Sequence, residues 1–234
     1  MPPPSQPVGP LVHPRPAKRP ERVTLRGRAV TLAPLDAEQH ADALFRGANG
    51  GDKDRVWTYM SDGPYADAAV FKANIAAKAQ SADPLFFAIL DNASGAPVGY
   101  QTLMRVDATH RVVEVGNVLY TPAIQRTVGA TEAQYLFARY VFDELGYRRY
   151  EWKCNDLNAP SKRAALRLGF TFEGVFRQHM IVKGRNRDTA WFSMLDSEWP
   201  ARRAAFERWL APENFDAAGR QKTSLSSLNG TAAA

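Results

Sequence analysis

Residues 119–146 read LYTPAIQRTVGATEAQYLFARYVFDELG, and this stretch joins a strand to a long helix. The strand pattern stops at Thr121-Pro122, small residues follow, and apolar residues then recur three and four positions apart, which predicts an amphipathic helix. A helix start leaves backbone N–H groups unpaired and carries a partial positive charge, and small side chains let an anion reach those groups. The junction therefore predicts either a phosphate site or an ordinary tight connection.

The pattern on both sides of this junction predicts an α+β fold with a mixed sheet. Strands are expected within residues 23–35, 85–106, 111–121, 150–154 and 170–195, and helices over residues 36–47, 52–60, 66–80, 131–146, 158–169 and 197–210. Asp36 and Asn158 are the expected N-terminal caps of two of these helices. Helices connect strands in the middle of the chain, whereas strands follow one another directly at both ends.

Length and composition restrict the class of protein. A chain of 234 residues suits one compact domain. The single cysteine, Cys154, excludes an internal disulfide and a multi-cysteine zinc site, and the four histidines lack ligand spacing, so we expect no metal. No apolar run approaches the roughly 20 residues that cross a bilayer, and no secretory signal is seen. We therefore expect no membrane partner and a reducing, cytoplasmic location.

The two ends differ in composition from the middle of the chain. Residues 1–21 are rich in proline and basic, which predicts a disordered leader. About half of the net charge of +6 lies in residues 1–22, so the body is only mildly basic, which argues against a nucleic-acid partner. Residues 212–234 lose apolar periodicity and are expected to form a flexible tail. The folded domain is then residues 22–211.

Residues 23–199 resemble the GCN5-related N-acetyltransferase superfamily, and within it the ribosomal-protein alanine acetyltransferase (RimJ/RimL-like) branch. Four segments carry the resemblance: LRGRAVTLAPL (25–35), EVGNVLYTPAIQRTVGATEA (114–133), NAPS with LRLGF (158–161 and 166–170), and FEGVFRQHMIVKGRNRDTAWFSML (172–195). The resemblance implies a central, mostly antiparallel, twisted sheet flanked by helices, whose fourth and fifth strands splay apart. It also implies acetyl-CoA as the acyl donor, with its pantetheine arm in the gap between those strands.

The family loop before the helix reads Gln/Arg-x-x-Gly-x-Gly/Ala. Aligned on Thr131-Glu132-Ala133, this chain has Gln125, then Val128 in place of the first glycine, then Ala130. A shift by one position restores a glycine but loses the last small residue. The resemblance assigns donor binding to the following residues: Asn117, Val118, Leu119, Tyr120, Gln125, Arg126, Thr127, Val128, Gly129, Ala130, Thr131, Asn158 and Ser161.

Direct transfer of an acetyl group needs a base for the amine and an acid for the leaving thiolate, each of which typically contributes about 10²- to 10⁴-fold. Glu114, on the fourth strand, is the expected base, although it also suits a strand glutamate that faces a lysine. Asp107 and Asp188 are weaker candidates. Cys154 is expected to be packed rather than to act as a nucleophile.

The tyrosine that acts as the acid in many members of the superfamily is replaced here by Ala165. Ser161 lies one turn earlier on the same helical face, so its hydroxyl is the expected partner of the sulfur. A capping role in the first turn is the alternative for this serine.

Three aromatic residues, Trp57, Tyr59 and Tyr65, cluster where the superfamily's helical insertion shapes the acceptor pocket. They suit stacking on a nucleoside or enclosure of an apolar amine, or else simple packing of the insertion.

Together these features predict an acetyl-CoA-dependent N-acetyltransferase acting on a primary amine of a small molecule or an aminoacyl-type acceptor. A protein N-terminal amine and a catalytically inactive acyl-CoA-binding module remain alternatives. Homodimer formation is left open.

Overall fold

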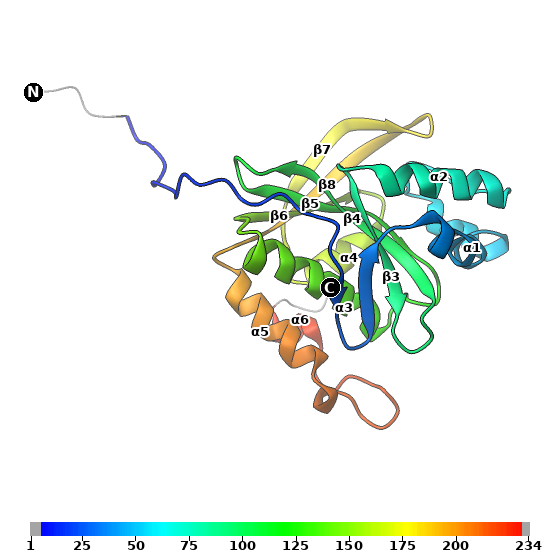
Figure 1. Ribbon diagram of the computed structural model, residues 1–234. Helices are drawn as coiled ribbons and strands as arrows, with labels where there is room; N and C mark the ends of the chain where they lie inside the picture. Colours follow the sequence, from blue (N-terminus) through cyan, green and yellow to red (C-terminus); the bar gives the residue numbers. More distant parts are fainter. Residues whose placement is uncertain (1–5, 231–234) are drawn as a thin grey trace, which may run out of the picture.

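The centre of the molecule is one eight-stranded sheet, in the order β1-β2-β3-β4-β5-β6-β8-β7 (Figure 1). The structure is a computed structural model that describes residues 6–230. Residues 1–5 and 231–234 lie outside the described part. The strands are β1 (Leu25–Arg26), β2 (Val30–Pro34), β3 (Leu85–Asp91), β4 (Pro97–Asp107), β5 (Val112–Tyr120), β6 (Arg149–Asn155), β7 (Thr171–Val182) and β8 (Arg185–Leu195). β5 and β6 are parallel, and the other neighbouring strands are antiparallel. The predicted mixed, mostly antiparallel sheet is confirmed.

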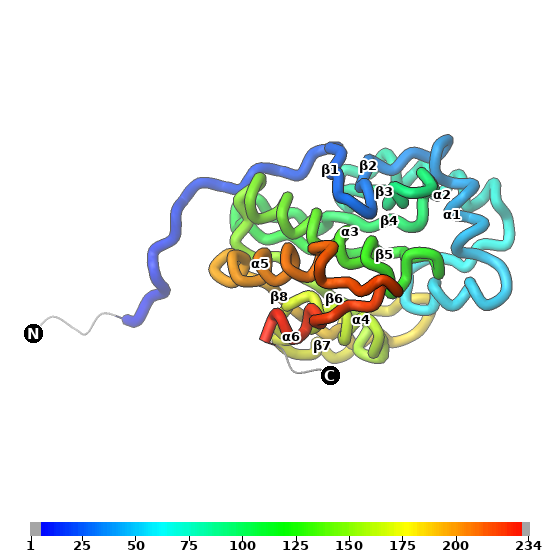
Figure 2. Tube along the Cα trace, turned by 90° about the horizontal axis from the view of Figure 1, so that it is seen from below, coloured from blue at the N-terminus to red at the C-terminus, as the bar shows by residue number. Residues whose placement is uncertain are grey.

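Helices cover both faces of the sheet (Figures 1 and 2). They are α1 (Ala37–Ala48), α2 (Ala68–Gln80), α3 (Val128–Arg139), α4 (Ala159–Arg167), α5 (Trp199–Leu210) and the short α6 (Leu225–Leu228). A 3-10 helix, η1 (Gly51–Trp57), follows α1, a π-helical turn, η2 (Tyr140–Glu144), continues α3, and a 3-10 turn, η3 (Pro212–Asn214), follows α5.

Strand β3 shows why helices are needed on both faces. Phe86 and Ala88 are buried in a core with α1, η1 and α2, whereas Phe87 and Ile89 are buried in the larger core that contains α3 and α5. Successive residues of a strand point to opposite faces, so its continuous apolar run LFFAIL requires cover on each side.

The helix starts follow from local sequence. The Asp36 carboxylate accepts a hydrogen bond from the Gln39 N–H (2.8 Å), which confirms the predicted cap of α1. The Asn158 side-chain oxygen accepts from the Ser161 N–H (3.2 Å), which confirms the predicted cap of α4. In the same way the Thr127 hydroxyl accepts from the Ala130 N–H (3.2 Å) at the start of α3. Each cap satisfies one of the N–H groups that a helix start leaves unpaired.

The predicted splay is confirmed at the centre of the sheet. β5 and β6 pair only from Val112 with Arg149 to Val115 with Trp152, although both strands continue further. Beyond this point β5 carries a bulge against β4, where Asn117 takes a positive φ of 45°. A bulge bends and twists a strand, which turns the end of β5 away from β6.

Part of each terminal segment lies against the domain more than the sequence suggests. Ala17 and Lys18, within the expected leader, donate backbone hydrogen bonds to the carbonyls of Ala108 (2.9 Å) and Leu145 (3.0 Å). The expectation of a flexible tail from residue 212 is wrong for residues 212–230, where Leu225 is fully buried and Asn229 is buried. Isolated side chains and backbone bonds fix this segment, and such anchors leave no periodic pattern in the sequence.

Candidate active site

A cavity of about 1700 Å³ opens where β5 and β6 separate. Its walls are the loop before α3, the end of β5, one side of α4, the η1 region, the β7–β8 hairpin and the segment after α5. Ligand pockets usually measure about 300–1,000 Å³. This cavity therefore has room for two substrates.

The junction between β5 and α3, within residues 119–146, forms one end of this cavity. The residues of the predicted donor-binding loop that lie on the cavity are Gln125, Arg126, Thr127, Val128, Ala130 and Thr131. Arg126 takes a positive φ of 64°, which turns the chain sharply into α3. Within residues 6–230, the N–H groups of Arg126, Val128 and Gly129 have no hydrogen-bond acceptor. The loop thus presents unpaired donors at the positive end of a helix dipole.

Gly129 is small for a different reason from the one expected. It does not line the cavity, because a Cβ at this position would lie 2.8 Å from Cγ1 of Val30 on β2. Its missing side chain lets the first turn of α3 approach the sheet, and its backbone N–H is the group that it offers to a ligand. The cavity-facing small residue is Ala130.

The end of β5 forms the next part of the wall. Asn117, Val118 and Tyr120 lie on the cavity, whereas Leu119 is fully buried in the core beside α1 and does not. The alternation of a strand explains this split, and it leaves only the backbone of Leu119 available to a ligand. Since β6 has already diverged, this edge of β5 has no strand partner among the described residues.

The hydroxyl of Tyr120 is held in a buried polar network. It donates to the side-chain oxygen of Gln101 (3.1 Å) and accepts from the side-chain amide of Gln134 (2.7 Å). Burial raises the pKa of this hydroxyl well above its usual value. Tyr120 therefore stays neutral and fixes the start of α3 against β5.

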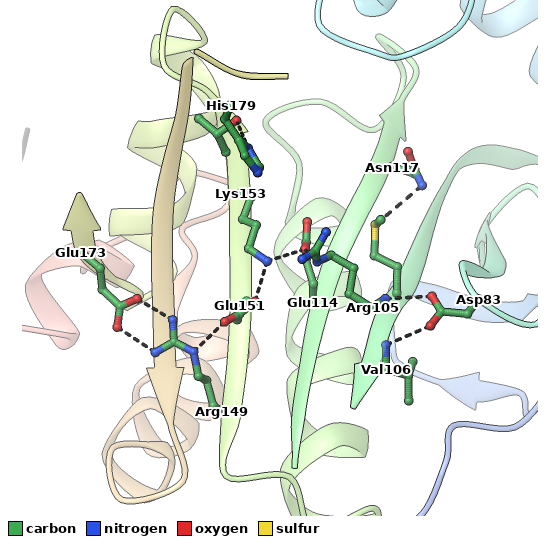
Figure 3. Close-up of polar contacts among 12 residues, drawn as sticks. Asp83, Arg105, Val106, Glu114, Asn117, Arg149, Glu151, Lys153, Glu173 and His179 are labelled. Carbon is green, nitrogen blue, oxygen red and sulfur yellow. Dashed lines mark hydrogen bonds and ion pairs between the residues drawn. The ribbon is translucent and has the colours of Figure 1, made fainter. Parts of the chain in front are cut away.

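Glu114 lies on the cavity with its carboxylate buried (Figure 3). Its Oε2 atom contacts Nζ of Lys153 at 2.9 Å and Nε of Arg105 at 3.5 Å. Burial raises the pKa of Glu114, and the charges of Lys153 and Arg105 oppose that rise, while Glu151 adds to it. Within the described chain Oε1 has no hydrogen-bond donor, so one oxygen of the carboxylate is held and the other is available.

The contacts of Glu114 continue across the sheet as a charge row (Figure 3). Its members, in order, are Arg105, Glu114, Lys153, Glu151, Arg149 and Glu173. Lys153 is the central member: its side chain is 5% exposed, its Nζ lies 2.6 Å from Oε2 of Glu151, and it stands 3.7 Å from the ring centre of Trp191. The opposite charges of Glu151 and Lys153 at alternate positions of the predicted strand 150–154, with Arg149 just before it, are a sequence signal that could have indicated this row.

Ser161 lies on the cavity in the first turn of α4. Its hydroxyl oxygen accepts a hydrogen bond from the Trp152 indole (3.0 Å), and its hydroxyl also hydrogen-bonds the sulfur of Cys154. Asn158, the cap of this helix, also lies on the cavity. Cys154 is buried and burial raises the pKa of its thiol, so it is a poor nucleophile.

The weaker candidates for the base are excluded from the cavity wall. Asp107 accepts hydrogen bonds from His110, and Asp188 accepts from the Gln178 N–H and the Asn186 amide. Neither lies on the cavity, and these hydrogen bonds lower the pKa of each carboxylate.

The aromatic cluster divides in a way that the sequence did not show. Trp57 is fully buried, donates its indole N–H to the Ala48 carbonyl (2.7 Å) and packs edge-on against Tyr65 and Phe71. Neither Trp57 nor Tyr65 lies on the cavity, so their expected role in substrate binding is corrected to packing of the insertion. Tyr59 does lie on the cavity, and its hydroxyl donates to the Leu157 carbonyl (3.1 Å).

Several residues on the cavity were not predicted from the sequence. Arg167 lies at the end of α4 and donates to the Thr131 hydroxyl (3.0 Å), and His179 is raised from a bulge in β7. The cavity is also lined by Trp209, near the end of the predicted domain, and by Phe215 and Gln221, which lie beyond that end. These residues come from elements far apart in sequence, and no local motif marks them.

Comparison with known proteins identifies the arrangement. Residues 29–171 match the family model described as "Acetyltransferase (GNAT) domain". The chain belongs to the GCN5-related N-acetyltransferase family.

Solved structures of GNAT proteins extend this likeness over most of the chain. A GCN5-related N-acetyltransferase from Brucella melitensis is 53% identical, with a TM-score of 0.90 over 92% of this chain and 98% of that one. A GNAT-family acetyltransferase structure from Chromobacterium violaceum ATCC 12472 is 42% identical, with a TM-score of 0.77 over 85% of this chain and 100% of that one. The chain is thus an N-acetyltransferase, and enzymes of the GNAT family use acetyl-CoA.

A curated relative agrees with the ribosomal-protein branch of the GNAT family. YdaF from Bacillus subtilis (strain 168), named as a candidate ribosomal N-acetyltransferase, is 25% identical over 181 residues, which are 76% of this chain and 94% of YdaF. In the part of the chain that the structure describes, no helix is long and apolar enough to cross a bilayer, and no group of three acidic, histidine or cysteine residues is placed to hold a metal ion.

Proposed function

We propose that this enzyme transfers the acetyl group of acetyl-CoA directly to the primary amine of a small-molecule or aminoacyl-type acceptor. One observation carries the proposal: a single cavity connects the unpaired N–H groups at the start of α3 to the available oxygen of Glu114. Direct transfer from a CoA thioester requires a site for the diphosphate anion and a general base for the amine in one cavity.

The residues present suit the donor. The N–H groups at the start of α3 are available to the diphosphate, and Val128 supplies its backbone donor as well as a glycine would. The free edge of β5 beyond Val115 offers backbone groups to the pantetheine arm. Bound acetyl-CoA supplies a thioester whose carbonyl carbon forms a bond with the amine nitrogen as the carbon–sulfur bond breaks and the thiolate leaves.

Glu114 is proposed as the base. The attacking amine must be neutral, and it loses a further proton as the new bond forms. The Oε1 atom of Glu114 accepts that proton through a water molecule, while Lys153 and Arg105 hold Oε2 and favour the ionised carboxylate. The buried position keeps the pKa of the carboxyl above its usual value, which suits a base.

Ser161 is proposed to stabilise the leaving thiolate. Since the Ser161 oxygen accepts a hydrogen bond from Trp152, its hydroxyl proton can be directed to the thioester sulfur of the acyl donor. Ala165 is fully buried and cannot replace the tyrosine of other GNAT enzymes. The acid function then falls to this one hydroxyl.

Two contacts across the acceptor end of the cavity support a small acceptor. Nζ of Lys183, at the turn of the β7–β8 hairpin, donates to the Trp57 carbonyl (2.8 Å), and Tyr59 bonds to Leu157 in the loop before α4. Both contacts join the η1 region to other elements of the cavity wall, the β7–β8 hairpin and the loop before α4, and so hold this part of the wall together. The similarity to YdaF favours the alternative acceptor, a protein N-terminal amine.

Thiol release from acetyl-CoA, measured over a panel of small amines, aminoacyl nucleotides and short peptides, tests the proposal. Turnover with small amines and none with peptides that begin with alanine or serine supports the assignment. Turnover confined to peptides would replace it with the alternative. Tight binding of acetyl-CoA in calorimetry with no turnover on any acceptor would identify an inactive acyl-CoA-binding module. A cytoplasmic location is also proposed. Gel filtration tests whether the enzyme forms a homodimer.

A further inference from the structure

The segment after α5 is a built part of the domain. Asn214 clamps it: its side-chain amide donates to the carbonyls of Trp209 (3.1 Å) and Thr223 (3.1 Å), and its oxygen accepts from the Thr223 N–H (2.9 Å). Phe215 and Gln221 form a backbone bridge within the loop that this clamp closes. Figure 2 shows the segment returning beneath the sheet from α5 to α6. The loop is therefore held in one shape by its own side chains.

The same segment is attached to α4 and, through it, to the start of α3. The side-chain amide of Asn229 donates to the Arg167 carbonyl (3.0 Å), and Arg202 donates to the Asn229 carbonyl (2.7 Å). The Arg167 guanidinium stands 4.8 Å from the ring centre of Trp209 and donates to the Thr131 hydroxyl (3.0 Å). Arg167 thus connects the first turn of α3 to the segment after α5.

The exposed side of this segment is a wall of the active-site cavity. Phe215, Gly219 and Gln221 lie on the cavity together with Trp209 and Arg167. The indole of Trp209 donates to the Gln221 side-chain oxygen (2.7 Å), so the Gln221 amide nitrogen is left to face a ligand. Phe215 is half-buried and meets Trp209 edge-on, with ring centres 5.2 Å apart. The wall combines an aromatic ring, an amide donor and a half-buried guanidinium.

Its position points to the nucleoside end of the donor. Ser161, beside the splayed strands, and Arg167 both line the cavity from α4, about 9 Å apart along the helix axis at 1.5 Å per residue. From the start of α3 the cavity therefore leads in two directions: toward Ser161 and the splay, and toward the segment after α5. A donor whose diphosphate lies at α3 and whose thioester reaches the splay must direct its nucleoside toward this segment.

We propose that residues 212–230 form the binding surface for the nucleoside end of the acyl donor, with Phe215 against the base and Gln221 as a hydrogen-bond donor to it. This surface lies beyond residues 29–171, which match the family model, and it rests on the proposed use of acetyl-CoA. The enzyme then distinguishes acetyl-CoA from an acetyl thioester that lacks a nucleotide.

The test compares two donors in a double variant, Phe215→Ala with Gln221→Ala. Stacking on an aromatic ring typically contributes about 1–3 kcal/mol, so the KM for acetyl-CoA should rise about tenfold. The KM for S-acetyl-pantetheine, which has no nucleotide, should stay the same. Arg220→Ala is the matched control, because Arg220 lies in the same loop, bonds only to Asp216 and does not line the cavity.

An equal rise in KM for both donors, or no rise for either, would overturn the proposal. Calorimetry with 3′-phosphoadenosine 5′-diphosphate measures nucleotide binding without turnover, so it tests the nucleoside site independently of the proposed function. Weaker binding of that nucleotide in the double variant, with unchanged binding in Arg220→Ala, supports the nucleoside site even if no amine acceptor is turned over. Unchanged binding in both variants removes it.

Discussion

The proposed donor end of the cavity is made largely of backbone, whereas the proposed acceptor end is made of charged side chains. At the donor end the N–H groups at the start of α3 and the free edge of β5 supply the polar contacts. At the acceptor end Glu114, Lys153 and Arg105 supply them, and their geometry depends on three different strands. The backbone groups are fixed by the fold itself, and the side chains depend on one another.

This difference explains which substitutions the molecule tolerates. Val128 stands where the family loop has a glycine, yet its N–H remains at the helix start. No comparable freedom exists for Lys153, because it is buried between two carboxylates, and removing it would leave charge uncompensated. Changes at the donor end should therefore act through bulk and charge, and changes at the acceptor end through proton transfer.

Glu114→Gln is the largest expected effect at the acceptor end. The amide cannot accept the proton, so kcat should fall about 10²- to 10⁴-fold while the acetyl-CoA KM stays unchanged. Thiol release as a function of pH is the measurement, and the acidic limb of the profile should disappear. A profile identical to that of the wild type would remove Glu114 from the mechanism.

Trp57→Ala should affect stability rather than recognition. Loss of a fully buried tryptophan typically costs about 3–5 kcal/mol, so thermal unfolding should occur at a much lower temperature. The folded fraction should keep its acceptor KM. Tyr59→Phe is the control, since it removes only the bond to Leu157. A raised acceptor KM in Trp57→Ala with normal stability would restore Trp57 to the binding site.

Ala130→Glu should act on the donor alone. A carboxylate at this position would occupy the positive end of α3, and the acetyl-CoA KM should rise by about 10- to 100-fold, the equivalent of about 1.4–2.7 kcal/mol. Gly129→Ala is the contrasting variant, because its new methyl group meets Val30 and should lower stability with little change in KM. Steady-state kinetics and thermal unfolding of both variants test the distinction, and a reversal of the two results would contradict it.

Lys153→Met should give the smallest loss of rate and a shift in pH dependence. Lys153 opposes the rise in the pKa of Glu114 that burial causes, so its removal should raise that pKa further and move the acidic limb of the activity profile to higher pH. A carboxyl whose folded pKa is raised stabilises the fold below its unfolded pKa and loses that contribution as the pH rises through the folded pKa. The variant should therefore also lose stability, relative to the wild type, with rising pH.

Lys153→Arg provides the rescue for this experiment. It keeps a positive charge beside Glu114 and should return the acidic limb toward its original position. If Lys153→Met and Lys153→Arg behaved alike, the charge of Lys153 would have no influence on the base.

Local features of the fold were predictable because neighbouring residues determine them. The caps at Asp36 and Asn158, the break before α3 and the order of the elements follow from side chains within a few positions of each site. Resemblance added the splayed strands and placed Glu114 beside them. The loop at residues 125–131 was found for the same reason, since a helix start is a local event.

The errors came from features that only packing determines. The sequence shows that residues 129–131 are small, but not that Gly129 meets Val30 while Ala130 faces the cavity. Nor does it show that Trp57 is turned into the core.

By itself, then, the sequence determined the elements, the exposed helix start proposed to bind the donor, and the family. The tertiary structure decided which side chains meet across the sheet: Lys153 reaches Glu114 over 39 positions, and Arg167 reaches Thr131 over 36. It also decided that the segment after α5 closes the cavity rather than leaving the domain. The physical reason is that helix starts and caps depend on contacts within a turn, whereas buried charges and cavity walls depend on contacts that form only when the whole chain is folded.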